Sequence, residues 1–513
     1  MLIKPLLYVA LLFAGLTNSV AAQQEPLSVI DWVKRNPDQP PMTSAVLPPR
    51  FEPPVAPDAR VPDVTVAPLE QQARRIIGIV PASVTGLPET LWTGSSAPAL
   101  AAQFTDLPNL RLPAAQALLY TLLLTEAIAP GQDADGEATL TLARVNALER
   151  LGAHDGAIAL LEQADVARDS DHFAAYMDLA LLTGEEDRAC AILSGKPYLS
   201  PSLAHRSFCA ARRGDWPTAA LLYDTGHSLG AIPAAQGAAL ERFLHPEAFE
   251  YNPPLPRPDK MTPLIFRLHE AIGEPFPTGA LPRSYAVADL RDLAGWKPQL
   301  EAAERLAATG ALSANRLLGL YTAREPAASG GVWNRVIAIQ NLETALRSRS
   351  IEAIEKNLPP AWLEMQKIGL EIQFAELFSS PLQRYDLTGM AGDISQTMGL
   401  LSSEYRDVAR KGDVPPLMAT LAGVERQMPP LLDTRATALQ RGLDVTNARA
   451  DLTDMARNGR MGEAILRALV LLDDGASGDP LALTQALATL RVFGLEETVR
   501  RAALQILLLE RYS

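Results

Sequence analysis

Apolar residues recur three and four positions apart along most of the chain from Ala97 onward. This spacing places them on one face of an α-helix. Alanine and leucine dominate these stretches, and glycine, proline or aspartate stands at the turns between them. The stretch AAQALLYTLLLTEAIAPG is one example, because its Pro-Gly pair closes the helix. No strand-rich block interrupts the pattern, so the sequence predicts an all-α fold.

One element, a glycine followed five residues later by an alanine, links four pairs of predicted helices. The glycine is expected to end one helix in the left-handed conformation, and the alanine lets the next helix pack closely on its partner. The first three glycines lie 32 and 30 residues apart, which indicates about one helical hairpin per unit. The four pairs are Gly152 with Ala157, Gly184 with Ala189, Gly214 with Ala219, and Gly459 with Ala464.

These stretches resemble the tetratricopeptide-like repeat family, whose Gly-x-x-x-x-Ala element joins the two helices of a unit of about 34 residues. The resemblance covers residues 143–230, with a weaker match at 455–509. It implies a helical-hairpin repeat, or α-solenoid, in which each hairpin buries its apolar face on its neighbours. The aromatic positions of the family's first helix are mostly missing here, so its concave peptide-binding groove is not implied.

The stretch at 1–22, MLIKPLLYVALLFAGLTNSVAA, has the three parts of a secretory signal peptide. Lys4 gives the positive start, residues 5–16 are apolar, and the small residues VAA at 20–22 form a cleavage site. An apolar run of this length is short for a membrane span, which needs about 20 residues; an uncleaved anchor is the alternative. We expect a mature chain that starts at Gln23, has no membrane span, and resides in the periplasm or is secreted.

Ten prolines fall within the 32 residues from Pro37 to Pro68. This composition favours extended chain with polyproline II stretches. We therefore expect residues 23–96 to be largely disordered. Leu91 and Trp92, near the end of this segment, would avoid open water and so lie against the folded body.

One short stretch before the prolines, LSVIDWVKRN at 27–36, has the features of a capped helix. Ser28 is the predicted N-cap, and Leu27 and Trp32 have the spacing of a hydrophobic staple. A helix this short is not stable alone in water, so it is expected to dock, either on a partner or on the body of this protein. Leu27, Ile30 and Trp32 are therefore candidate binding residues.

A second proline-rich stretch, HPEAFEYNPPLPRPDKMTP, occupies residues 245–263. Helical patterns continue on both sides of it. The stretch predicts a boundary between two helical domains, 97–250 and 251–513.

Several stretches taken together resemble an uncharacterised family of exported alphaproteobacterial helical proteins. They are the signal, PLSVIDW, the proline-rich spacer, SVTGLPETLW and AASGGVWNR. Automatic annotation sometimes labels that family "antifreeze glycopeptide polyprotein". The resemblance covers most of the chain and implies no established activity. The label fits poorly, because ice-binding glycopeptides are Ala-Ala-Thr repeats and this chain has no such tract.

The amino-acid composition limits which binding partners and which cellular compartment are expected. The formal net charge is −13, which argues against nucleic acid or an anionic membrane as the main partner. The two cysteines, Cys190 and Cys209, lie in neighbouring predicted helices. An even pair in an oxidising compartment predicts a disulfide. A redox-active pair is the alternative, but the sequence contains no C-x-x-C.

Motifs that support catalysis are absent from the sequence. It contains no H-E-x-x-H, no G-x-S-x-G, no S-x-x-K and no glycine-rich phosphate loop. The six histidines are widely spaced along the chain, so we interpret them as solvated turn or capping residues rather than zinc ligands. We therefore expect no metal, no cofactor and no catalytic residue.

One internal loop, YTAREPAASGGVWNR at 321–335, is a further candidate binding site. It combines Arg324 with a flexible SGG hinge and Trp333, as a binding loop on a helical scaffold would. A plain connection between helices, whose tryptophan returns to the core, would have the same sequence.

These features together predict a non-enzymatic periplasmic helical-repeat scaffold or adaptor that binds envelope proteins. The alternative is an enzyme of cell-wall (peptidoglycan) metabolism or its accessory subunit, by analogy at the level of the fold. A third interpretation is purely structural packing without a specific ligand. The sequence leaves the oligomeric state open.

Overall fold

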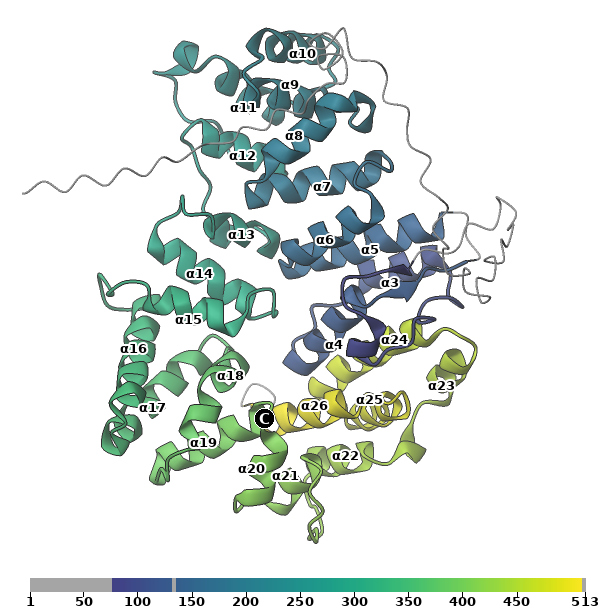
Figure 1. Cartoon of the computed structure of the whole chain (residues 1–513), viewed down its shortest axis with the longest axis vertical. Helices are drawn as coiled ribbons and strands as arrows, with labels where there is room; N and C mark the ends of the chain where they lie inside the picture. The colour runs from purple at the N-terminus through teal and green to yellow at the C-terminus, as the bar shows by residue number, and fades with distance from the viewer. Residues whose placement is uncertain (1–75, 132–134, 510–513) are drawn as a thin grey trace, which may run out of the picture. The chain divides into compact units, whose positions relative to one another are not determined.

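The computed structural model describes residues 76–131 and 135–509. This part of the chain is mostly helical, at 68% helix in 25 α-helices, accompanied by one pair of two-residue strands. The all-α prediction is confirmed. The described residues belong to one compact unit (Figure 1). In the described ranges, no helix has both the length and the apolar composition of a membrane span.

The helices follow one another along the chain with short turns between them. The N-terminal group consists of β1 (Ile76–Ile77), α2 (Ala82–Thr85), α3 (Ala97–Asp106), α4 (Pro113–Leu124), β2 (Ala127–Ile128), α5 (Gly136–Leu151), α6 (His154–Ala164), α7 (Ser170–Thr183), α8 (Glu186–Gly195), η1 (Pro197–Leu199), α9 (Leu203–Arg212), α10 (Trp216–Ser228), α11 (Ala234–Leu244) and η2 (Pro246–Phe249). The middle group consists of α12 (Pro263–Ala271), η3 (Thr278–Ala280), η4 (Arg283–Tyr285), α13 (Ala286–Asp289), α14 (Trp296–Ala307), α15 (Ala314–Thr322), α16 (Val332–Ser348), α17 (Ile351–Gln366) and α18 (Glu371–Leu382). The C-terminal group consists of α19 (Gly389–Leu401), α20 (Tyr405–Lys411), α21 (Pro416–Leu421), α22 (Thr434–Gly442), η5 (Val445–Asn447), α23 (Ala450–Arg457), α24 (Met461–Ala476), α25 (Pro480–Val492) and α26 (Glu496–Leu508).

Neighbouring helices pack as hairpins, and the glycines at four of the turns have the predicted conformation. Gly152 and Gly184 cap α5 and α7 with φ of 86° and 87°, in the left-handed region that glycine enters without strain. Gly214 and Gly459 have φ of 80° and 78°. The alanine five residues after each of these glycines is completely buried, so the following helix approaches its partner closely.

Cys190 on α8 and Cys209 on α9 form the predicted disulfide. Their Cα atoms are 5.0 Å apart, and both residues are buried between two helices that pack against each other. The sequence separation is 19 residues. The disulfide therefore fixes one pair of adjacent helices rather than joining distant parts of the chain.

A buried arginine connects the first elements of this unit. Arg144 on α5 is 1% exposed, and its guanidinium donates to the carbonyls of Leu123, Ile77 and Thr125 at 2.7, 2.9 and 2.8 Å. Two of these carbonyls lie at the end of α4, where helix geometry leaves backbone acceptors unpaired. Burial lowers the pKa of Arg144 to about 10. One side chain thus joins α4, α5 and β1.

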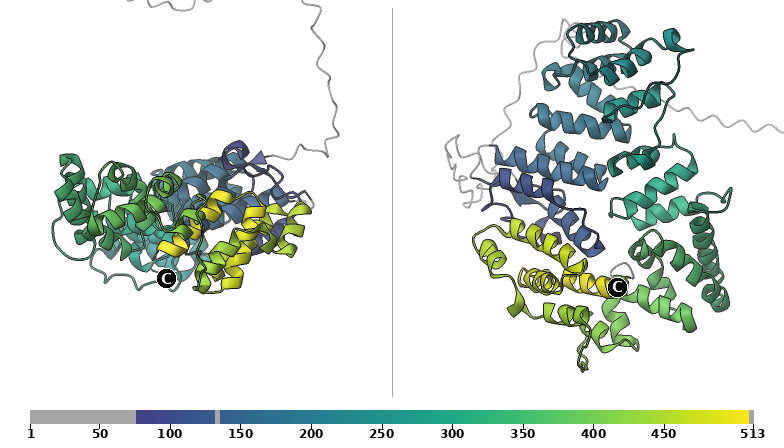
Figure 2. Two further views of the ribbon diagram at one scale, coloured as in Figure 1. Left: turned by 90° about the horizontal axis from the view of Figure 1, so that it is seen from below. Right: turned by 180° about the vertical axis from the view of Figure 1, so that it is seen from behind.

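The last helices of the chain pack against the first ones. α4 contacts both α24 and α26, and Figures 1 and 2 show them side by side. A turn before α3 also contacts the segment that leads into α24. The N–H of Gly94 donates to the carbonyl of Gly459 at 3.1 Å, and the N–H of Gly462 donates to the carbonyl of Leu91 at 2.9 Å. Beside these bonds, the fully buried ring of Trp92 lies directly over Gly462.

Two expectations about the organisation of the chain differ from this arrangement. The segment expected to be largely disordered, 23–96, packs into the helical unit from Ile76 on, where β1 pairs with β2, and the side chains of Leu91 and Trp92 are 0% exposed, as expected. The expected domain boundary near 250 falls inside the compact unit, where α11 and α12 contact each other across the proline-rich stretch. Residues 23–75 lie outside the described part of the chain.

Adding one methyl group at Gly462 tests the contact between the first and last segments. An ideal Cβ there would stand 2.3 Å from Cζ3 of Trp92, and the buried ring has no space into which to move. We expect Gly462→Ala to lower the free energy of unfolding by about 1–3 kcal/mol, the usual range for overpacking, as measured by urea unfolding.

Gly319→Ala is the matched control for this experiment. A Cβ at Gly319, which is exposed on α15, meets no atom within 4 Å. This substitution should raise the free energy of unfolding by about 0.5–1 kcal/mol, because alanine is the better helix former. Equal effects of the two substitutions would contradict the packing argument.

Candidate functional site

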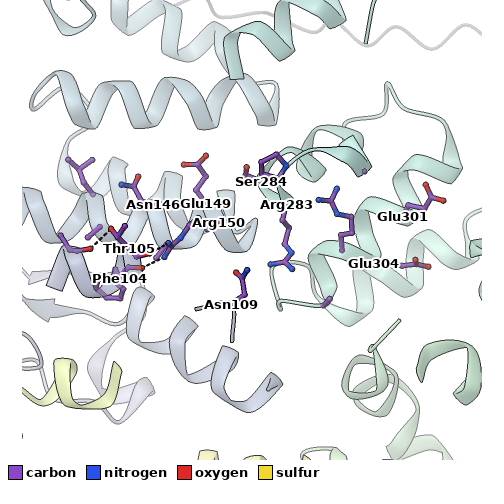
Figure 3. Close-up of a pocket in the computed structure, with 18 of the residues that line it drawn as sticks. Phe104, Thr105, Asn109, Asn146, Glu149, Arg150, Arg283, Ser284, Glu301 and Glu304 are labelled. Carbon is purple, nitrogen blue, oxygen red and sulfur yellow. Dashed lines mark hydrogen bonds between the residues drawn. The ribbon is translucent and has the colours of Figure 1, made fainter. Parts of the chain in front are cut away.

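A cleft of about 1260 Å³ opens between two groups of helices. α3 and α5 form one wall, and η4 and α14 form the other (Figure 3). Small-molecule sites usually have volumes of about 300–1,000 Å³, so this cleft has room for a segment of a polymer. Its polar lining includes Thr105, Asn109, Asn146, Glu149, Arg150, Arg283, Ser284, Glu301, Glu304 and Arg305.

Arg150 comes from the last turn of α5 and is held by α3. Its guanidinium donates to the carbonyl of Thr105 at 2.8 Å and to the carbonyl of Phe104. Both carbonyls lie at the end of α3, where backbone acceptors have no helical partner and a cation is favoured by the helix dipole. These bonds fix Arg150 at the edge of the cleft, and no carboxylate of the described residues pairs with its charge.

The opposite wall contributes Arg305 and Arg283. Arg305 on α14 donates to the carbonyls of Thr278 and Leu281, both at 2.8 Å. Arg283 on η4 is half-buried, yet its guanidinium makes no hydrogen bond or ion pair with any residue that the structure describes. Burial, and then repulsion from Arg305, lowers the pKa of Arg283. Figure 3 shows Arg283 in the middle of the cleft, extending towards Asn109.

Two carboxylates of the same wall are compensated by cations. Glu304 accepts hydrogen bonds from the guanidinium of Arg335 at 2.7 and 2.6 Å and from the hydroxyl of Tyr321 at 2.8 Å. Glu301 lies 3.6 Å from the ammonium of Lys297, one turn earlier on α14. The negative charge on α14 is therefore largely neutralised by its own neighbours.

Glu149, on the α5 wall of the cleft, is half-buried. Burial raises the pKa of Glu149. Asp178, on the adjacent α7, has a pKa raised to about 7 by burial and by the charge of Glu149. Burial, followed by the charges of Asp178 and Glu149, also raises the pKa of Tyr285. Asp178 and Tyr285 do not line the cleft, so Glu149 is the acidic group of this wall whose pKa burial raises.

The site residues that the sequence suggested lie elsewhere. Arg324 is exposed on the loop after α15, and its carbonyl accepts from the side-chain amide of Gln340 at 2.8 Å. Trp333 is half-buried in the first turn of α16, and its ring packs on that of Trp296 with centroids 5.1 Å apart. Neither lines the cleft. The other suggested binding residues, Leu27, Ile30 and Trp32, lie outside the described residues.

The 321–335 loop nevertheless contributes to the cleft, because the residues at its two ends contact a residue of the cleft wall. Tyr321 stands at its start and Arg335 at its end, and both bind the carboxylate of Glu304. The loop therefore positions one residue of the α14 wall, which its sequence alone did not indicate.

Three of the six histidines are buried, whereas the sequence suggested solvated positions. His154, His172 and His269 are 1%, 0% and 2% exposed. Nδ1 of His172 lies 2.9 Å from the carboxylate of Asp169, the N-cap of α7. Residues 76–131 and 135–509 contain no group of three or more His, Cys, Asp or Glu side chains that could hold a metal ion.

No protein-family model, curated protein or solved structure matches this chain. The function is therefore argued from the cleft and from the sequence. Its three arginines, Arg150, Arg283 and Arg305, escaped sequence analysis because they are far apart along the chain and lie in ordinary helix or turn contexts. What they share, a position on one cleft without a carboxylate partner, exists only in the folded chain.

The raised pKa of Asp178 predicts a specific dependence of stability on pH. Its folded-state pKa of about 7 lies above the ordinary value of 3.8, so its favourable contribution is complete at low pH and is lost as the pH rises through 7. We expect Asp178→Asn to be more stable than the wild type at pH 8, by at most about 4 kcal/mol, and the difference to shrink towards pH 4. Thermal unfolding across this range measures it, and an equal difference at both pH values would contradict it.

Proposed function

We propose that this protein is a non-enzymatic scaffold or adaptor, exported to the periplasm, that holds a segment of an envelope protein in the cleft between α5 and α14. The observation that carries the proposal is the cleft itself, which is open, about 1260 Å³ in volume, and lined by amide, hydroxyl and guanidinium groups. Such groups offer a bound chain hydrogen-bond donors and acceptors along its length.

The proposal includes a finer description of the fold. We take the hairpins with left-handed glycines at their turns as units of an α-solenoid of the tetratricopeptide-like kind. In such arrays each unit contacts only its neighbours, and the stacked helices present an extended binding surface. The resemblance to exported alphaproteobacterial helical proteins belongs to the same proposal.

Export is supported by two independent features. The stretch at 1–22 has the pattern of a signal peptide. The disulfide between Cys190 and Cys209 is of the kind that persists in oxidising compartments such as the periplasm.

The N-terminal motif supplies a second contact in this proposal. Leu27, Ile30 and Trp32 would dock on the same partner, and the proline-rich spacer would tether them to the helical unit at about 3.1 Å per extended residue. A tethered second contact raises the effective concentration of the first and so the overall affinity.

Site-specific photocrosslinking in cells tests the scaffold function. A photoreactive side chain in place of Asn146, which is exposed on the cleft wall, should capture one specific envelope protein, identified by mass spectrometry. The same side chain in place of Asn315, which is exposed on α15 and does not line the cleft, is the matched control. Adding Trp32→Ala should reduce the yield at Asn146 by roughly 10-fold, because the second contact is lost.

Each outcome of this experiment bears on a separate part of the proposal. The absence of a partner at Asn146, or the same partners at both positions, would overturn the scaffold function. An unchanged yield with Trp32→Ala would leave the cleft as the binding surface and remove the N-terminal motif from it.

A second candidate function is the cleavage of peptidoglycan, or assistance to an enzyme that cleaves it. One observation favours it: Glu149 lines the cleft and has a pKa raised by burial, as a general acid in glycoside hydrolysis requires. This candidate predicts that the wild type releases soluble fragments from purified sacculi and that Glu149→Gln does not. Absence of release by the wild type would eliminate it.

A further inference from the structure

We infer that the segment held in the cleft is an acidic peptide, and that Arg283 recognises its carboxylates with Arg150 and Arg305 beside it. The inference rests on the proposed function, because it names the chemical class of the segment that the scaffold binds. Four observations lead to it: the unpaired arginines, the compensated glutamates, the free donors of Arg283 and the uncharged polar lining.

The arginines of the cleft lack carboxylate partners. Within the described residues, none of Arg150, Arg283 and Arg305 has a carboxylate oxygen within 4.0 Å. Asp289 is the acidic group that acts on Arg305, but its carboxylate binds the hydroxyl of Thr278 instead. The cleft therefore contains three guanidinium groups whose charge is not matched by a direct ion pair.

Three partly buried arginines of neighbouring segments, Arg242, Arg267 and Arg291, are paired with carboxylates. Arg267 lies 2.7 Å from the carboxylate of Glu186 and 3.1 Å from that of Glu270, and Arg291 also binds Glu270. Arg242 lies 2.7 Å from Glu274. Arg283 and Arg305, which are partly buried to a similar degree, differ from these three in having no carboxylate partner among the described residues.

The glutamates of the cleft do not supply the missing negative charge. Glu304 is bound on both oxygens by Arg335, and Glu301 faces Lys297. Burial raises the pKa of Glu149, and even when ionised this residue supplies one negative charge against three guanidinium groups. A chain with a formal net charge of −13 therefore has a local excess of positive charge at this cleft.

Arg283 contributes most to this excess of positive charge. It is half-buried and beside Arg305, and no described residue accepts any of its five N–H donors. Its planar guanidinium matches a carboxylate, which it can bind through two parallel hydrogen bonds. A carboxylate here would satisfy the donors and relieve the repulsion between the two arginines.

The remaining lining favours a peptide over a polysaccharide. Asn109, Asn146, Thr105 and Ser284 pair well with the amide groups of an extended chain. The aromatic residue of the cleft, Phe104, is 1% exposed, so it offers no ring face on which a sugar could stack. An acidic peptide fits both the charge and the neutral groups.

Fluorescence anisotropy with defined probes tests the inference on the full mature chain. The probe is a labelled ten-residue peptide of alternating glutamate and serine, and its control has glutamine in place of glutamate. We expect the glutamate peptide to bind the wild type at least roughly 10-fold more tightly than the glutamine peptide, and Arg283→Gln to remove most of this difference. Arg316→Gln, an exposed arginine on α15 outside the cleft, should leave it unchanged.

Thermal unfolding serves as the control that the variant is folded. Because the guanidinium of Arg283 makes no hydrogen bond or ion pair with the described residues, Arg283→Gln should unfold at the wild-type temperature or above it. The charge reversal Arg283→Glu should weaken binding of the glutamate peptide further, which a merely structural role would not produce.

Several results would overturn the inference. These are equal binding of both peptides, binding of the glutamate peptide that Arg283→Gln does not weaken, tighter binding of an acidic oligosaccharide such as oligogalacturonate, and no binding of the glutamate peptide. If a partner is nevertheless crosslinked at Asn146, the scaffold function stands and only the acidic class is wrong. If neither binding nor crosslinking occurs, the scaffold function fails as well.

Discussion

The arrangement of this protein depends on the contact between Trp92 and the backbone of Gly462. The indole ring is fully buried and touches the position where any other residue would carry its Cβ. Nearby, a Cβ on Gly94 would meet backbone atoms of Gly459 at 2.7 Å, so two chain segments approach as only glycines allow. The contact lies at the start of α24, which packs on α4, and just before α3, whose Gln103 donates to the carbonyl of Glu463 at 3.3 Å. Since α3 packs on α5, one wall of the cleft is fixed by the same contact.

Arginine has a recurring structural use in this unit that lysine could not fill. Arg144, Arg150 and Arg305 each donate to two or three backbone carbonyls near the ends of helices or turns. A planar fork with several N–H donors reaches such groups of acceptors at once, whereas an ammonium is a single point charge. Only eight of the 46 basic residues are lysines. Carbonyl bonds position a guanidinium without cancelling its charge, which is how Arg150 and Arg305 remain available beside Arg283.

Local patterns predicted what depends on local physics. The helices, the left-handed glycines such as Gly152, and the disulfide between Cys190 and Cys209 all follow from residues close in sequence. The burial of Trp92 was expected, but its partner was not, because Gly462 lies near the other end of the chain. The cleft was missed for the same reason. Its charge balance depends on which carboxylates the fold pairs with other cations, and the pairing of Glu304 with Arg335 crosses a loop that the sequence suggested for a different role.

The distance between Trp92 and Gly462 along the chain also has a consequence for biosynthesis. Hairpins closed by local turns, and the disulfide within one of them, can form while the chain is still emerging. The contact of α4 with α24 and α26 cannot, because these helices are made last. Until then the face of α4 that packs on them, where the N–H of Ala114 donates to the side chain of Gln505, has no cover. A chain interrupted before α24 would therefore retain an exposed apolar face, by which chaperones and proteases could distinguish it from the finished protein.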